Sequence, residues 1–405
     1  MTRTAPVLLL LVMPAHGLDW PQWRGPARDG HSTDLAPRAS WPPALKPAWK
    51  VAVGAGYASP VLVGDRVFVF AREGDEEVVQ SLELASGRRV WRAAYPAPYV
   101  VNSAAASHGS GPKSTPVVAG GRVFTFGIGG VLSCLDAASG RVIWRKDFGG
   151  QSRGAAPLYG VAMSPVVSDG LLVAHVGGEE GGALTAFDAA TGAVRWAWKG
   201  DGPGYASPVV AEIAGVRQVV TLSESSIVSV SAAKGEQLWK VPFTTAYAQN
   251  AVTPVVNGDA VIYSGLDQPV RAVRIVRRGA GLDPQPLWEN TEVAAYMSTP
   301  VLAAGRLYGL SHRKRGQFFS LDAATGRTVW LSPGRAGENA AIVAGGGMLF
   351  LLTTDGELIA LSQGAASFAP LARYTVAPSS TWAHPVILDA GVVVKDADSL
   401  AFLRF

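Results

Sequence analysis

Cysteine and charge are both scarce in this sequence of 405 residues. A single cysteine, Cys134, cannot form a disulfide within the chain or a cysteine-rich zinc site. Only 16% of the residues are charged, well below the roughly 25% of typical globular proteins, which argues against a disordered chain and against a coiled coil. The net charge is only +4, and no Lys/Arg run is long enough to follow a phosphate backbone, so we expect no nucleic-acid partner.

The N-terminus carries an apolar run that is too short to span a membrane. Arg3 precedes the apolar stretch Ala5–Met13, and small residues follow as far as Gly17. This is the pattern of a secretory signal peptide cleaved after Gly17, whereas a membrane span needs about 20 apolar residues. We therefore expect a periplasmic or secreted protein without a transmembrane span; a disordered tail is the alternative. The residue directly after Gly17 is not a cysteine, so no lipidated cysteine is expected there.

Helical periodicity is also missing, and a repeat takes its place. A Ser/Thr-Pro-Val marker, with His in place of Ser/Thr at the last position, recurs along the chain at Pro60, Pro116, Pro165, Pro208, Pro254, Pro300 and Pro385. The last interval is nearly double the others, which predicts a hidden repeat at Asn339–Val343, where Ala341 stands in place of proline. Eight units then average about 46 residues, a length typical of propeller blades.

A second marker, a tryptophan, follows each of the first six prolines by 28 to 34 residues. The six are Trp91, Trp144, Trp196, Trp239, Trp288 and Trp330. Each unit divides into four short apolar runs bounded by Gly and Asp/Ser turns. In the second unit these runs are Thr115–Ala119, Arg122–Phe126, Val131–Leu135 and Arg141–Lys146. The pattern predicts an all-β fold, an eight-bladed β-propeller of four-stranded antiparallel blades.

The two ends of the repeat predict how the ring closes. The last unit supplies only three expected strands, at Pro385–Leu388, Gly391–Lys395 and Leu400–Phe405. The segment Lys46–Val53 resembles an orphan fourth strand, because its Trp49-Lys50-Val51 repeats the pattern of Trp239-Lys240-Val241. An N-terminal strand that completes the last blade leaves no long sheet edge open. The expected layout, for a monomer, is a signal peptide at 1–17, an N-terminal extension at 18–45 and a propeller at 46–405.

A turn of constant composition precedes several of the tryptophans. It is Asp136-Ala-Ala-Ser-Gly140 before Trp144, and it recurs from Asp188 to Gly192 and from Asp322 to Gly326. The Asp and Ser/Thr side chains can bond the local backbone, the glycine accepts a positive φ, and the tryptophan offers a large apolar face with one N–H donor. This Asp-x-x-Thr-Gly-x-x-x-Trp pattern resembles the tryptophan-docking motif of PQQ-type propellers, and the resemblance covers the chain from about Lys46 to Phe405.

The resemblance implies two functional classes. Quinoprotein dehydrogenases of this family hold PQQ with Ca²⁺ in the central funnel and use an Asp base, whereas scaffolds of the BamB type are non-catalytic. The lone Cys134 rules out the adjacent Cys-Cys pair of many dehydrogenases, and no Glu/Asn/Asp set maps onto calcium ligands. We therefore expect a non-catalytic binding scaffold without a cofactor. A PQQ-dependent dehydrogenase acting on an alcohol or sugar, with PQQ and Ca as cofactors, is the alternative. The stretch Trp20–Gly30 resembles the N-terminal motif of secreted bacterial PQQ-repeat proteins of unassigned role.

Candidate ligand-binding residues are those that break the repeat consensus just before the inner strands, where propeller ligands bind. They are His108, Lys113, Tyr159, Tyr205, Asn250, Tyr296, Asn339 and His384. By repeat symmetry they are expected to ring one mouth of the channel and to bind a protein or a small polar ligand. The alternative is that they satisfy loop backbone groups or bound water. A carbohydrate- or peptide-binding module is a third possible function. No catalytic residue and no metal site is predicted, because a zinc site from His108, His312 and His384 would need ligands from three blades.

Overall fold

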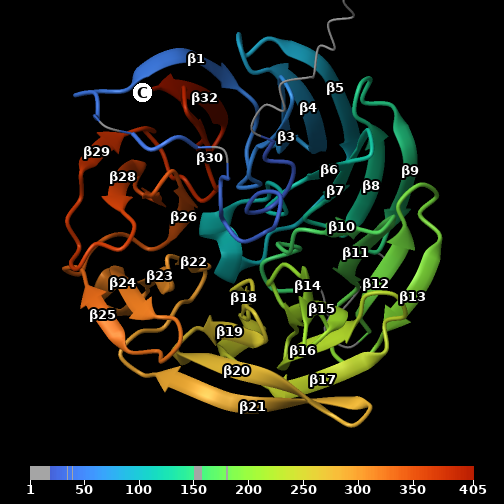
Figure 1. The fold of residues 1–405 in the computed structure, drawn as a ribbon. Helices are drawn as coiled ribbons and strands as arrows, with labels where there is room; N and C mark the ends of the chain where they lie inside the picture. The colour runs from blue at the N-terminus through green and yellow to red at the C-terminus, as the bar shows by residue number, and fades with distance from the viewer. Residues whose placement is uncertain (1–18, 34, 39, 150–156, 179–180) are drawn as a thin grey trace, which may run out of the picture.

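The computed structural model describes residues 19–33, 35–38, 40–149, 157–178 and 181–405. The predicted signal peptide lies outside the described residues. Eight four-stranded antiparallel sheets are arranged as blades around one central axis (Figure 1). The predicted eight-bladed propeller is therefore confirmed. Within the described residues, no helix is long and apolar enough to cross a membrane.

The blades follow one another in chain order, each running from an inner strand at the axis to an outer strand at the rim. Blades 1 and 2 contain β2 (Val61–Val63), β3 (Arg66–Glu73), β4 (Glu76–Glu83), β5 (Arg89–Pro96), β6 (Val117–Ala119), β7 (Arg122–Phe126), β8 (Val131–Asp136) and β9 (Val142–Asp147). Blades 3 and 4 contain β10 (Val166–Ser168), β11 (Leu171–Val176), β12 (Ala183–Asp188), β13 (Val194–Trp198), β14 (Val209–Ile213), β15 (Val216–Leu222), β16 (Ser226–Ser231) and β17 (Gln237–Pro242).

The second half of the ring has the same order. Blades 5 and 6 contain β18 (Val255–Asn257), β19 (Ala260–Gly265), β20 (Gln268–Arg278), β21 (Gly281–Asn290), β22 (Val301–Ala303), β23 (Arg306–Ser311), β24 (Gln317–Asp322) and β25 (Thr328–Leu331). Blades 7 and 8 contain β26 (Ala340–Gly345), β27 (Met348–Thr353), β28 (Glu357–Ser362), β29 (Ala372–Thr375), β30 (Val386–Leu388), β31 (Gly391–Lys395), β32 (Ser399–Arg404) and β1 (Lys46–Ala52). Short 3₁₀ helices lie in the connecting loops at η1 (Ser103–His108), η3 (Ala246–Ala248) and η4 (Arg313–Arg315).

The ring closes as the sequence predicts. Strand β1 pairs antiparallel with β32, from Lys46 opposite Arg404 to Ala52 opposite Ser399, and so completes blade 8. The hidden repeat is also present, because β26 carries Ala341 at the expected place and begins a complete blade 7. Blade 8 is thus four-stranded like the other seven blades.

The Ser/Thr of the repeat marker links neighbouring blades by hydrogen bonds near the axis. Its hydroxyl accepts a hydrogen bond from the backbone N–H of the equivalent residue one blade earlier. The bonds run from Ser59 to Thr115 (3.2 Å), Thr115 to Ser164 (2.9 Å), Ser164 to Ser207 (2.9 Å), Thr253 to Thr299 (3.0 Å) and His384 to Ser59 (2.8 Å). The last of these joins blade 8 to blade 1. The recurrence of the marker therefore follows from the need to satisfy buried N–H groups between blades.

At the rim, six tryptophans dock on the turn of the next blade. Trp91 donates its indole N–H to the Ala137 carbonyl at 3.0 Å, and its ring lies against Gly140 of the same turn. The same bond is made by Trp49, Trp144, Trp196, Trp288 and Trp330. Trp239 instead donates to Gln218 at 2.8 Å, because blade 5 replaces the turn with the long β20–β21 hairpin. The docking motif is thus a structural device.

The N-terminal extension enters the central channel. We call residues 19–32 the channel segment. Trp20 exchanges two backbone hydrogen bonds with Leu62 of β2, at 2.7 and 2.9 Å, and Ser32 donates its backbone N–H to Ala344 of β26 at 2.8 Å. The extension therefore joins the inner strands of blades 1 and 7, and its blue trace crosses the middle of Figure 1.

Two buried arginines fix the channel segment. Arg24 and Arg28 are only 1% and 4% exposed. Arg24 donates to the carbonyls of Thr299 and Pro300, just before β22, at 2.8 and 2.7 Å, and Arg28 makes two bonds of 2.8 Å to carbonyls just before β10. No carboxylate of the described residues forms an ion pair with either guanidinium. Burial lowers the pKa of Arg24 to about 10 and that of Arg28 to about 9, so both remain charged at neutral pH.

Candidate functional site

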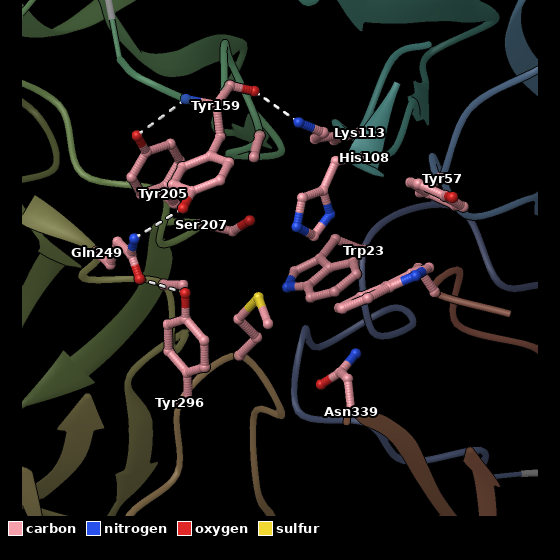
Figure 2. A pocket seen from close by; sticks show the side chains of 14 residues that line it. Trp23, Tyr57, His108, Lys113, Tyr159, Tyr205, Ser207, Gln249, Tyr296 and Asn339 are labelled. Atoms are coloured by element: carbon pink, nitrogen blue, oxygen red, sulfur yellow. Dashed lines mark hydrogen bonds between the residues drawn. The ribbon is translucent and has the colours of Figure 1, made fainter. Parts of the chain in front are cut away.

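A cavity lies on the propeller axis, between the channel segment and the loops that precede the inner strands. It has a volume of about 160 Å³. Its lining residues are Trp23, Tyr57, His108, Lys113, Tyr159, Ala162, Tyr205, Ser207, Gln249, Ala251, Tyr296, Met297, Asn339 and Trp382 (Figure 2). Aromatic rings form much of this surface, and no Asp or Glu of the described residues lines it.

Equivalent positions of successive repeats converge on the cavity. Tyr159, Tyr205 and Tyr296 each lie just before the inner strand of their blade, so the rotation of the ring turns them toward one point. His108 arrives differently, at the end of η1 in the insertion between β5 and β6. Asn102 caps η1 by accepting the Ala104 N–H at 2.9 Å, and the coiled segment reaches the middle of the ring (Figure 1). The insertion thus brings an imidazole that the repeat alone does not supply.

One wall of the cavity is held by a chain of hydrogen bonds across five blades. Lys113 donates its ammonium to the Tyr159 carbonyl at 2.6 Å, and the Tyr159 N–H is bonded to the Tyr205 hydroxyl at 3.3 Å. The Gln249 amide donates to the Tyr159 hydroxyl at 3.0 Å and accepts from the Tyr296 hydroxyl. Because these five side chains fix one another, the wall is preformed (Figure 2).

The facing wall is a group of rings in edge or tilted contact. The His108 ring lies 5.2 Å from that of Trp382 and 5.6 Å from that of Tyr159, measured between ring centroids. Trp382 also lies 6.0 Å from Tyr57. Together these rings bring apolar faces and polar edges to the same small space, an arrangement suited to a ligand with a ring of its own.

Trp23 comes from the channel segment, lines the cavity and also contacts buried residues behind it. Its indole N–H donates to Thr253 at 3.0 Å, and its ring lies 4.3 Å from His384, which is buried behind it. The N-terminal extension therefore contributes a lining residue.

The cavity carries one positive charge at neutral pH. Burial lowers the pKa of Lys113 to about 8, which leaves the ammonium largely protonated. Burial and the Lys113 charge also lower the pKa of His108, against the opposite effect of Glu338, so the imidazole is neutral. Burial raises the pKa of Tyr296 to about 12, and its hydroxyl keeps its proton.

Six of the eight residues that the sequence proposed for the funnel line this cavity, and two do not. His108, Lys113, Tyr159, Tyr205, Tyr296 and Asn339 line it. Asn250 is fully buried, and its amide donates to the carbonyls of Ser223 at 2.7 Å and Phe243 at 3.1 Å, so it holds a loop. His384 lies behind Trp23, where burial and the nearby Arg24 charge keep its pKa far below the usual value. In both segments a neighbour faces the cavity instead: Gln249 and Trp382.

The sequence had no direct signal for Trp23 and Tyr57. Trp23 lies in the Trp20–Gly30 stretch, which was identified from the sequence only by its resemblance to an N-terminal motif and was not placed in the channel. His312 lies away from the cavity lining and is bonded to Asp267 at 2.8 Å. Among the described residues, no group of three or more His, Cys, Asp or Glu could hold a metal ion. Cys134 is buried in β8, as expected, and burial raises its pKa to about 12, which makes it a poor nucleophile.

Two solved structures show the same propeller fold. A quinohemoprotein alcohol dehydrogenase from Comamonas testosteroni is similar with a TM-score of 0.70 and 16% identity, over 96% of this chain and 81% of that one. BamB from Moraxella catarrhalis is similar with a TM-score of 0.63 and 14% identity, over 89% of this chain and 98% of that one. At these identities both likenesses concern the propeller architecture.

Sequence comparisons are more specific. Outer membrane protein assembly factor BamB from Shewanella oneidensis is 27% identical over 230 residues, which are 54% of this chain and only 56% of that protein. The BamB of Bordetella pertussis is 24% identical over 380 residues, covering 89% of this chain and 87% of that one. The family model described as outer membrane protein assembly factor BamB matches residues 75–332. The chain therefore belongs to the BamB-type family of PQQ-like repeat propellers.

Proposed function

We propose that the protein is an exported, non-catalytic binding scaffold, periplasmic or secreted, that holds a protein or a small polar ligand at the funnel of its propeller. The observation that carries the proposal is the preformed cavity on the axis, with aromatic walls, one ammonium and no carboxylate in its described lining. Such a surface binds and orients a ligand but supplies no carboxylate base for proton transfer. By its family the scaffold would serve outer membrane protein assembly.

The alternative, a PQQ-dependent dehydrogenase acting on an alcohol or sugar, is weaker because the lining does not fit its cofactor. Calcium takes six to eight oxygen ligands, usually with carboxylates among them. The oxygens at this cavity come from neutral Tyr, Ser, Gln and Asn side chains, and the Lys113 ammonium lies among them. The structural likeness to the quinohemoprotein dehydrogenase concerns the fold and does not supply the missing ligands.

Two measurements test the proposal. The purified protein, incubated with PQQ and Ca²⁺, is assayed for dye reduction over a panel of alcohols and sugars; we expect no turnover. The same protein is then applied to glycan and peptide arrays together with two tyrosine variants. Tyr57→Ala opens the cavity wall, whereas Tyr247→Ala removes a tyrosine that is 76% exposed on a loop outside the lining.

Array signal that is lost in Tyr57→Ala and kept in Tyr247→Ala supports a funnel scaffold. Robust PQQ-dependent turnover that disappears when a cavity residue is changed would overturn the non-catalytic assignment. Signal that both variants retain would place binding elsewhere on the protein and reject the funnel as its site.

A further inference from the structure

The Lys113 ammonium makes few contacts with the rest of the protein. Of its three N–H donors, one is bonded to the Tyr159 carbonyl at 2.6 Å. The Tyr159 ring lies 5.8 Å away, and in the described part of the chain no carboxylate lies within ion-pairing distance. Lys113 lines the cavity, so its charge and two N–H donors that are not bonded to described residues are available to a ligand there. Lys113 is half-buried, and a charge partly removed from water is stabilised by an opposite charge, so an anionic ligand group is the natural partner.

The charges around the cavity add to this preference. Arg24 and Arg28 are buried in the same channel segment as the lining residue Trp23 and are bonded to carbonyl and amide oxygens. The carboxylates that act on these groups are Asp29, near Arg24, and Glu338, which acts on His108 and Tyr296; both are exposed and lie outside the cavity lining. Three cations against two solvated carboxylates leave a net positive field, which attracts an anion.

Several other polar atoms of the lining residues have no hydrogen-bond partner among the described residues. The His108 ring nitrogens, the Trp382 indole N–H, the Tyr57 hydroxyl and the Asn339 amide nitrogen make no hydrogen bond with other described residues, although all four side chains line the cavity. A purely apolar or aromatic ligand would leave these groups desolvated and unbonded, which is costly. A ligand ring that carries hydroxyl groups would satisfy them while its apolar face lies against the aromatic walls.

The size of the cavity suits one ring. Its volume of about 160 Å³ is close to the roughly 150 Å³ that accommodates a benzene molecule in an engineered protein cavity. We propose that this cavity binds an acidic sugar, one pyranose ring of the uronate type, with the carboxylate on the Lys113 ammonium and the hydroxyls on the free polar groups around it. This inference rests on the proposed funnel-binding function and names the class of ligand.

Ligand-observed NMR and tryptophan fluorescence titrations with D-glucuronate, D-glucose and benzoate test the proposal on the intact protein. We expect glucuronate to bind at least about tenfold more tightly than glucose, because a hydrogen bond to a charged group is worth at least that factor. Benzoate has the charge and a ring but no hydroxyls, and we expect it to bind more weakly than glucuronate.

Lys113→Met should bring the ratio of glucuronate to glucose affinity close to one. Lys113→Gln keeps a donor for the Tyr159 carbonyl, which guards against a folding defect, and should lose the preference equally. Lys234→Met is the matched control, because it removes an exposed lysine in the β16–β17 turn and should leave the ratio unchanged.

Equal affinity for glucuronate and glucose, benzoate binding as tight as glucuronate, or a preference that survives both Lys113 variants would each overturn the proposal. Binding of neither sugar, together with a peptide signal that Tyr57→Ala abolishes, would also overturn it while leaving the funnel scaffold intact. If no ligand binds at the funnel, both the uronate proposal and the proposed funnel scaffold are overturned.

Discussion

Gly140→Ala tests whether the repeat tryptophans press on the turn of the next blade. Gly140 has a φ of +73°, and a Cβ added there would lie 2.5 Å from Cε3 of Trp91. Gly121 in the same blade offers a matched control, because its φ is +71° and an added Cβ meets nothing within 4 Å. The two substitutions share the backbone penalty and differ only in the contact with the indole.

The expected costs follow from these two terms. An L-residue in the left-handed region loses about 1–2 kcal/mol, which is the whole cost for Gly121→Ala. Overpacking against the indole adds about 1–3 kcal/mol, so Gly140→Ala should lose about 2–5 kcal/mol in total. Urea unfolding followed by circular dichroism gives both changes in the free energy of unfolding. In a Trp91→Leu background, Gly140→Ala should cost no more than Gly121→Ala does.

Equal destabilisation by Gly140→Ala and Gly121→Ala would refute the reasoning. It would mean that the indole can move away from the turn without loss, so that the contact between blades depends on the N–H bond to Ala137 rather than on close packing.

Three further predictions concern the axis. Glucuronate affinity should fall as the pH rises through about 8, because the Lys113 ammonium then loses its proton, whereas titrations of Lys113→Gln should stay flat over the same range. Thr115→Val removes the acceptor of the buried Ser59 N–H and should cost about 1–3 kcal/mol in urea unfolding, with the exposed Thr375→Val as an unchanged control. Arg24→Met removes two charge-assisted bonds to blade 6 and should cost about 3 kcal/mol; no loss would mean that apolar contacts hold the channel segment.

The sequence specified the ring because its devices are local and repeated. The marker proline, the docking tryptophan and the turn glycine each act within one blade or between neighbours, so their spacing records the geometry directly. Blade 7 lacks the proline and was still located, because spacing predicted it. The closing strand was found for the same reason: Trp49 sits where the outer strands of blades 1 to 6 carry their tryptophan.

The cavity was predicted less completely because it depends on which side chain of a neighbouring pair turns inward. Gln249 and Asn250 are adjacent, and only Gln249 faces the axis, whereas Asn250 bonds the loop from behind. The sequence marks such a segment as polar but does not fix its local dihedral angles. Trp23 was beyond reach for another reason. Its segment belongs to no blade, and its place in the channel depends on long-range bonds made by Arg24 and Arg28.

The pairing of β1 with β32 also governs when the molecule can fold. Lys46 lies opposite Arg404, so a strand made early in synthesis has no partner until almost the whole chain has left the ribosome. The channel segment likewise cannot form its hydrogen bonds to blades 6 and 7 until those blades have been synthesised. Contacts of such high sequence separation slow folding. Blades can therefore form one after another as the chain emerges, but the closed ring and the finished cavity at its centre come last and together.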